Sequence, residues 1–222
     1  MPRTLLRQNG FPEELMERIL NNYIAKTYSW EQMKIKIENM YNFLGELGYS
    51  RKTIIKMSEL FPGLYIKTTE DILNKRDFFI ELGFSLKEFL SMFRLFPHIV
   101  SHGKDAIVEK ISTLMEFGLS KKEALNVLKT SPGIVALSKN NIIKSIQGIS
   151  ELGYTKKDIL IILKTASSLV GYSLDTLKVK IAFLISLGYS KEQVTSIIKK
   201  FPGILILATD TIDEKINGLI TL

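Results

Sequence analysis

The sequence predicts an all-α fold, a helical-repeat solenoid of about six repeats of 35 residues. Three observations predict it. A Leu-Gly-aromatic-Ser motif returns at a constant spacing of 35 residues, apolar residues inside each unit recur at helical intervals, and no linker divides the chain. Each unit would bury its apolar face only against its neighbours, which is how a solenoid is stabilised.

The recurring motif reads as the end of one helix and the start of the next. Glycine adopts the left-handed backbone at a helix C-terminus without a Cβ penalty, and the Ser or Thr two residues later caps the following helix. Glu88, Glu123, Asp158 and Gln193 lie three residues beyond their caps, and three of these are expected to complete a capping box or its close relative. Thr53 is the exception. The five copies are Leu47-Gly48-Tyr49-Ser50, Leu82-Gly83-Phe84-Ser85, Phe117-Gly118-Leu119-Ser120, Leu152-Gly153-Tyr154-Thr155 and Leu187-Gly188-Tyr189-Ser190.

The first helix of each unit follows the cap and spans about eleven residues. Counted from the cap as position zero, positions four, seven, eight and eleven are mostly apolar and form one helical face. Prolines 62, 97, 132 and 202 then stop the helix, whereas Ser167 fills that place in one copy and predicts a softer break. We expect the aromatic residues at position eleven and beside the turn glycine to serve as core or staple. These residues are Phe61, Phe96 and Phe201, and Tyr49, Tyr154 and Tyr189.

A second helix follows in every unit, and its core positions also recur every 35 residues. Ser29, Trp30 and Gln32 open a further helix that ends near Leu47, after a degenerate copy of the motif at Asn9–Pro12. We therefore predict one repeat domain over residues 1–222, with a degenerate repeat at 1–46 and five regular repeats at 47–222. The two core columns are Ile72, Ile107, Ile142, Leu177 and Ile212, and Phe79, Leu114, Ile149, Leu184 and Leu219.

The complete unit resembles the repeat of the mitochondrial transcription termination factor (mTERF) family. The resemblance rests on Leu-Gly-aromatic-Ser/Thr, a helix, Pro-x-Ile/Leu-aliphatic as in Pro132-Gly133-Ile134-Val135, and a longer helix. It implies a left-handed superhelix, a short 3₁₀ turn after the proline, and a basic groove for nucleic acid. Pentatricopeptide, tetratricopeptide and ankyrin repeats remain as alternatives, although their proline placement, Trp-Leu-Gly-Tyr pattern or Thr-Pro-Leu-His motif is not found here.

Composition describes a folded protein that favours anionic partners. The chain is 45% hydrophobic and 24% charged, with a net charge of +7. It has no cysteine, which excludes disulfides and thiolate chemistry and fits a reducing compartment. Its longest apolar runs, such as Ile159–Leu163, are far shorter than the roughly 18 residues of a membrane span. We expect an intracellular location, mitochondrial or plastid in a eukaryote and cytoplasmic in a bacterium.

Basic residues recur at three positions of the first helix and form the candidate nucleic-acid-binding site. The position-one column is Arg51, Lys121, Lys156 and Lys191; the position-two column is Lys52, Lys87, Lys122 and Lys157; and the position-nine column is Arg94, Lys129, Lys164 and Lys199. Acidic residues instead recur near the end of the preceding second helix, at Glu46, Glu81, Glu116 and Glu151.

A solvated surface explains the position-nine column well, because bases near a helix C-terminus complement the helix dipole. It explains positions one and two poorly, because the same dipole disfavours lysine in the first turn. Only six of the 30 basic residues are arginine, the residue that reads guanine edges with a bidentate fork. The pattern therefore favours contacts with phosphates over the reading of bases.

Catalysis and metal binding find little support in the sequence. His98 and His102 are the two histidines and lack an evident third ligand, and neither a Gly-x-Gly-x-x-Gly nor a Gly-Lys-Ser/Thr phosphate loop occurs. We expect no catalytic residue, no metal and no cofactor.

The sequence thus predicts a nucleic-acid-binding regulator of gene expression, of the transcription-termination type, that grips the backbone of double-stranded DNA or structured RNA. The alternative is an adaptor solenoid for a protein partner such as an RNA-modifying enzyme.

Overall fold

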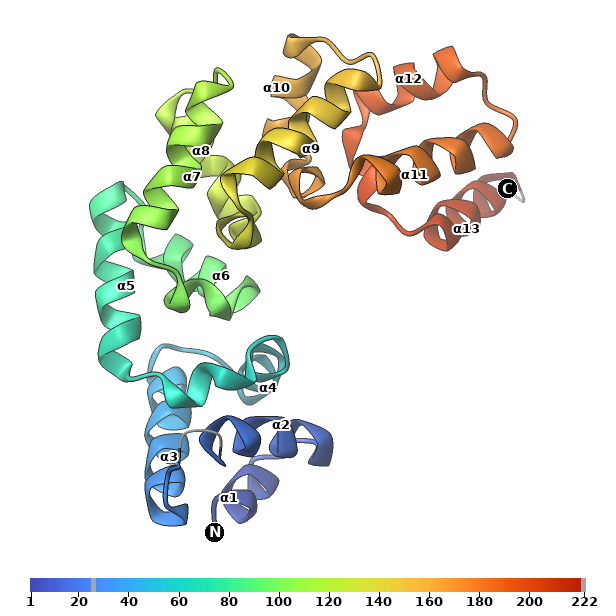
Figure 1. Cartoon of the computed structure of the whole chain (residues 1–222). Coiled ribbons are helices and arrows are strands. Elements are labelled where there is room, and N and C mark those ends of the chain that lie inside the picture. The colour runs from blue at the N-terminus through green and yellow to red at the C-terminus, as the bar shows by residue number, and fades with distance from the viewer. Residues whose placement is uncertain (25–26, 221–222) are drawn as a thin grey trace. The chain divides into compact units, whose positions relative to one another are not determined.

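The computed structural model describes residues 1–24 and 27–220, and the side chains of Ile24 and residues 215–220 lie outside the description. The described residues form α-helices and short 3₁₀ helices without a strand (Figure 1), which confirms the all-α helical-repeat fold. Their contacts divide the chain into two compact units, Met1–Lys104 and Asp105–Leu222. A single domain over 1–222 stays a prediction. Leu219, expected in a core column, lies among the residues whose side chains are not described.

The first unit holds three N-terminal helices, the first regular repeat, and the first helix and 3₁₀ turn of the second regular repeat. Its elements are α1 (Pro2–Gln8), α2 (Glu13–Ile24), α3 (Trp30–Glu46), α4 (Arg51–Leu60), η1 (Pro62–Ile66), α5 (Thr69–Leu82), α6 (Leu86–Leu95) and η2 (Pro97–Ser101).

The second unit continues the alternation of a ten-residue first helix, a 3₁₀ turn and a longer second helix (Figure 1). Its elements are α7 (Lys104–Glu116), α8 (Lys121–Thr130), η3 (Pro132–Ala136), α9 (Lys139–Glu151), α10 (Lys156–Thr165), η4 (Ser167–Gly171), α11 (Leu174–Ser186), α12 (Lys191–Lys200), η5 (Pro202–Ile206) and α13 (Thr209–Ile220).

The predicted turn chemistry is confirmed at every regular repeat. The five turn glycines have φ between 88° and 108°, the left-handed region that glycine reaches without strain. Capping boxes form at four of the five first helices, one more than expected, through Glu88, Glu123, Asp158 and Gln193. Thr53 forms none, as expected. A further box joins Thr68 and Asp71 at the start of α5.

The apolar face of the first helices lies in the core of each unit. Position four is buried throughout, as the residues Ile54, Phe89, Ala124, Ile159 and Val194 show. Position eleven lies just beyond the helix end, and its burial differs between repeats, since Ala166 is buried there. Phe201 is 68% exposed, so the expectation that it belongs to the core is wrong. Phe61 and Phe96 are half-buried.

Ser167 ends α10 as sharply as the prolines end the other first helices. The expected softer break is wrong, because α10 stops at Thr165 and η4 begins at Ser167, in the same register as the proline copies. The Ser167 hydroxyl is buried and lies 2.7 Å from Ser131 Oγ and 3.0 Å from Thr130 Oγ1. These hydrogen bonds to the preceding repeat hold the turn where a proline would otherwise fix φ.

The tyrosine beside the turn glycine connects two repeats. Tyr49 Oη donates to the carbonyl oxygen of Leu90 at 2.7 Å, and its ring lies edge-on to Phe93 of the next first helix. The predicted staple therefore acts between repeats as well as within the turn.

The N-terminal residues are packed as helices despite their degenerate repeat pattern. α3 begins with a capping box between Ser29 and Gln32, as the sequence predicts. The buried Tyr23 hydroxyl on α2 donates to the carbonyl oxygen of Tyr65 in η1, which joins the N-terminal helices to the first regular repeat.

Two glycines near the end of α3 offer a matched test of the turn. Gly45 is helical and Gly48 has φ of 88°, and a Cβ added at either would meet no atom within 4 Å. We expect Gly48→Ala to lower the free energy of unfolding by about 1 kcal/mol, because alanine is strained in the left-handed region. Gly45→Ala should raise it by about 0.5–1 kcal/mol, since alanine is the better helix former. Urea unfolding measures both, and a loss of stability at both positions would contradict this account of the turn.

Candidate nucleic-acid interface

The residues of the three basic columns all lie on first helices, and all but one have exposed side chains. Lys129 is half-buried, whereas the other eleven residues are exposed. The three columns are nevertheless not equally available to a ligand, because their side chains contact different neighbouring residues.

Two lysines of the position-nine column form ion pairs with the preceding repeat. Lys164 Nζ lies 2.7 Å from Glu123 Oε1, and Lys199 Nζ lies 3.1 Å from Asp158 Oδ2. Glu123 and Asp158 are the capping-box acids of α8 and α10, so one carboxylate both caps its own helix and binds the lysine of the next. These lysines therefore have a structural role that the sequence did not reveal.

The capping acids are held in their charged form. Hydrogen bonds from Lys164 and from the Ser120 backbone lower the pKa of Glu123 to about 2. Hydrogen bonds from the Thr155 side chain and backbone, with a smaller one from Lys199, lower the pKa of Asp158. Each carboxylate is thus anionic, and compensates its lysine, at any pH near neutrality.

Arg94 differs from the other members of its column for a reason visible in the sequence. Thr53 occupies the place in α4 that an acid occupies in α8 and α10. Arg94 accordingly forms no ion pair with a described residue, and its guanidinium lowers the pKa of the nearby Tyr49, against the larger effect of burial, which raises it.

Two members of the position-one column, Arg51 and Lys156, lie beside a glycine turn that precedes them in the chain. Arg51 Nε donates to the carbonyl oxygen of Asn9 at 2.6 Å, and Nη2 donates to that of Gln8 at 3.4 Å. A Cβ on Gly10 would lie 2.2 Å from Arg51 Nη2 and would displace the guanidinium, and the φ of 73° at Gly10 itself favours glycine. Lys156 passes beside Gly118, where its Cε is 3.6 Å and its Nζ 3.9 Å from the place of a Cβ.

This placement explains why a base is tolerated in the first turn of these helices. The dipole of the base's own helix opposes it, but the carbonyl end of the helix that finishes at the neighbouring glycine turn, α1 for Arg51 and α7 for Lys156, favours a cation beside it. For Arg51 and Lys156, a base in the first helical turn is therefore no longer evidence of nucleic-acid binding. Lys121 and Lys191 are exposed members of the same column.

The position-two column has no such structural partner. Lys52, Lys87, Lys122 and Lys157 are exposed, and none forms a hydrogen bond or ion pair with another residue in the described part of the chain. Their ammonium groups stand in the first turn of α4, α6, α8 and α10, where local helix stability disfavours them.

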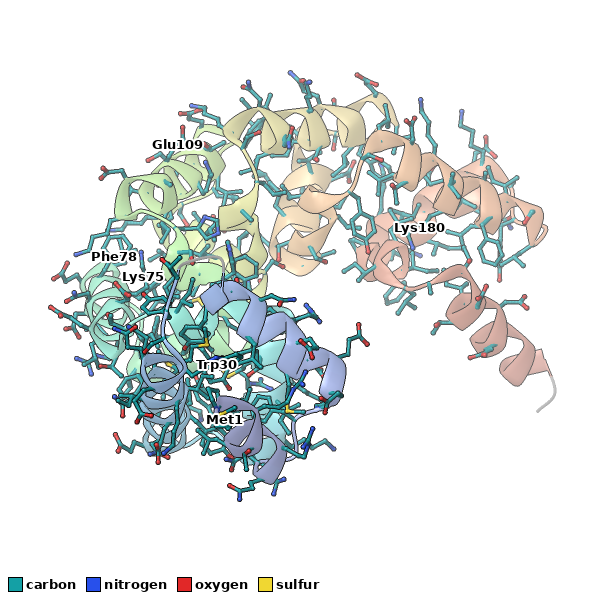
Figure 2. The ribbon with its side chains drawn as sticks, turned by 60° about the horizontal axis from the view of Figure 1, so that its bottom comes forward. Met1, Trp30, Lys75, Phe78, Glu109 and Lys180 are labelled. Carbon is teal, nitrogen blue, oxygen red and sulfur yellow. The ribbon has the colours of Figure 1, made fainter. Side chains whose placement is uncertain are left out.

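A fourth basic column lies on the second helices and escaped the sequence analysis. Lys75, Lys110 and Lys180 recur at intervals of 35 or 70 residues, with Ser145 between them. Lys75 and Lys110 are buried, and Lys180 is half-buried. Figure 2 labels Lys75 beside Phe78 on α5, and Lys180 on α11. The constant spacing of these lysines could have revealed the column in the sequence. It was missed because a charged residue near apolar columns is normally expected to be exposed.

The acidic column is partly compensated as well. Lys139 Nζ on α9 lies 2.8 Å from Glu116 Oε1 at the end of α7, and Glu46, Glu81, Glu116 and Glu151 are all exposed.

The two histidines lie together in the first unit, His98 within η2 and His102 directly after it. His98 Nδ1 is 3.2 Å from His102 Nε2, with the rings of Phe61 and Phe96 packed against them. Among the described residues no three His, Cys, Asp or Glu side chains gather in a way that could hold a metal ion. No described helix is long and apolar enough to cross a membrane.

Comparison with known protein families identifies the same family as the repeat motif. The sequence model of the family described as mTERF matches residues 4–107 and 96–186, which together run from residue 4 to residue 186. The match includes the N-terminal helices, where the repeat motif is degenerate, and it confirms the resemblance drawn from the motif. No curated protein matches the chain.

The ion pair of Glu123 predicts a pH dependence of stability. A carboxyl whose pKa falls from 4.5 to about 2 on folding contributes stability above pH 4.5, and this is lost as the pH falls toward 2. Glu123→Gln keeps a capping side chain, as Gln193 does on Ser190, but removes the charge. We expect the wild type to be the more stable at pH 7 and the difference to vanish near pH 2 in urea unfolding. A difference that is constant across this range would contradict the assignment.

Proposed function

The chain belongs to the mTERF family, and from that premise we propose that it binds the phosphate backbone of nucleic acid through the lysines of the position-two column. Membership of the family indicates a nucleic-acid-binding regulator in general. The proposal adds which residues bind, and through what chemistry.

The proposal rests on the different contacts that the basic columns make. Members of the position-nine and position-one columns bind carboxylates and carbonyl oxygens of the neighbouring repeat. The position-two lysines bind no described residue, although their place near a helix N-terminus costs local stability. Retaining cations at an unfavourable site on four first helices is explained if an external anion compensates them.

The residue type indicates how such a surface would recognise its ligand. The ammonium group of lysine is a strongly hydrated point charge that suits a phosphate and carries no base preference of its own. Recognition would therefore depend on the shape and charge of the backbone of double-stranded DNA or structured RNA. Binding should weaken steeply with salt, because each phosphate contact releases condensed counterions.

The biological role that we propose is regulation of transcription, including termination, by binding and without catalysis. A protein of this kind would act where genes are expressed: in the mitochondrion or plastid of a eukaryote, or in the cytoplasm of a bacterium.

A second role, as an adaptor for a protein partner such as an RNA-modifying enzyme, is favoured by apolar side chains on the second unit. Val179 on α11 is 65% exposed, and Phe201 at the end of α12 is 68% exposed. A protein partner would cover such residues, whereas a phosphate chain would not.

Two double variants in the second unit test this difference between the columns. Lys122→Gln/Lys157→Gln removes position-two charges, and Lys164→Gln/Lys199→Gln removes the same charge from position nine. We expect the first to reduce affinity for duplex DNA about tenfold or more and to lower the salt slope by roughly 1.8. The second should change the slope less and lower the melting temperature more, because it breaks the pairs with Glu123 and Asp158. Fluorescence anisotropy with duplex DNA and structured RNA at several salt concentrations measures both.

Equal salt slopes for the two double variants would contradict the assignment to position two. Failure of the wild type to bind either ligand at low salt would favour the adaptor role.

A further inference from the structure

Two lysines of the second-helix column make the same contact, and Ser145 makes it with a shorter side chain, whereas Lys110 binds the carboxylate of Glu109. The ammonium groups of Lys75 and Lys180 donate to the carbonyl oxygens of His102 and Leu207, each 27 residues further along the chain. Ser145 Oγ donates at 3.1 Å to the carbonyl oxygen of Tyr172, again 27 residues on. The fold therefore offers the same acceptor just after η2, η4 and η5.

A second column beside it is also smallest at the Ser145 repeat. Its members are Phe78, Thr113, Gly148 and Phe183, one helical turn after Lys75, Lys110, Ser145 and Lys180. In the first unit the Lys75 ammonium lies 5.9 Å from the centre of the Phe78 ring, so the two side chains fill that space together (Figure 2). At the Ser145 repeat both are replaced by residues with almost no side chain.

An open cleft in the second unit lies beside Ser145 and Gly148, where Leu174 packs close to Gly148 and a Cβ added at Gly148 would lie 3.2 Å from the Leu174 Cβ. It has a volume of about 490 Å³ between α9 and the segment from η4 to the start of α11. Leu137, Val170 and Leu174 give it an apolar wall, while Asn141 and Glu151 supply polar groups beside Ser145. Glu151 and Lys144 are its charged residues, so the lining has no net charge.

We propose that this cleft binds a small unbranched aliphatic primary amine of the length of a lysine side chain, such as a diamine. The ligand's ammonium group would donate to the carbonyl oxygen of Tyr172, which keeps a second lone pair beside the Ser145 hydroxyl. Its methylene groups would lie against Leu137 and Leu174, and Glu151 would attract its charge.

The chain supplies the precedent for this binding mode. Lys75 and Lys180 place the same chemical group, on the same length of alkyl chain, against the equivalent carbonyl oxygens of two other repeats. The ammonium of Lys180 also lies 5.7 Å from the ring of Tyr172, the residue whose carbonyl oxygen would accept from the amine. Because the protein carries a net charge of +7, amines are not drawn to it by its overall field. Binding of an amine would therefore indicate a specific contact with the cleft.

Thermal unfolding with 1,4-diaminobutane tests the proposal on the full chain. A ligand that binds only the folded state raises the melting temperature with its concentration. We expect millimolar diaminobutane to raise it by about 2 °C or more. Tetramethylammonium, which lacks an N–H donor, and 1-butanol, which lacks the charge, should leave it unchanged.

Two variants of α9 provide the matched comparison. Ser145→Lys puts into the cleft the residue found at positions 75 and 180, and should raise the melting temperature and abolish the response to diaminobutane. Ser150→Lys adds the same charge at an exposed residue outside the cleft and should keep the response.

The absence of any shift in the wild type would overturn the proposal, and so would an equal shift in Ser145→Lys. Should Ser145→Lys fail to fold, saturation-transfer NMR on the wild type and Ser150→Lys decides. Transfer to the methylene protons of diaminobutane, reversed by excess n-butylammonium but not by tetramethylammonium, supports binding, and no transfer refutes it.

Discussion

The contact between successive first helices is the constraint on which the other features depend. In the second unit two first helices present a capping carboxylate to the lysine of the next, Glu123 to Lys164 and Asp158 to Lys199. Such exposed ion pairs contribute little to stability, so apolar burial at positions such as Ala124 and Ile159 holds the repeats together. The ion pairs follow from the constant repeat length, which brings Lys164 to Glu123 and Lys199 to Asp158.

The repeat length made the fold predictable, because glycine turns, caps and apolar spacing all point to the same boundaries. The expectations that failed concern places where a neighbouring repeat decides the outcome. The softer break expected at Ser167 ignored hydrogen bonds from Thr130 and Ser131 of the preceding repeat. Phe201 was assigned to the core by its position on a helical face, but the helix ends one residue earlier and leaves the ring exposed.

The sequence predicted the three basic columns. It could not show which of their residues bind neighbouring repeats and which have no such partner. A sequence shows that Lys157 and Lys164 recur in register, yet the partner of Lys164 belongs to another helix. The buried lysines were missed for the same reason. A lysine such as Lys75 is stable inside the protein only because a carbonyl oxygen of the following turn accepts from it. The division between structural and available lysines is thus a property of the stacking of repeats, and it provides the surface that we assign to nucleic acid.

Chemical acetylation of lysines, followed by mass spectrometry, tests this division most directly. In the free protein Lys122 and Lys157 should react faster than Lys164 and Lys199, whose ammonium groups are held by carboxylates. Adding duplex DNA or structured RNA at low salt should protect Lys122 and Lys157 and leave the other two almost unchanged. Protection confined to Lys164 and Lys199, with Lys122 and Lys157 still reactive, would contradict the account.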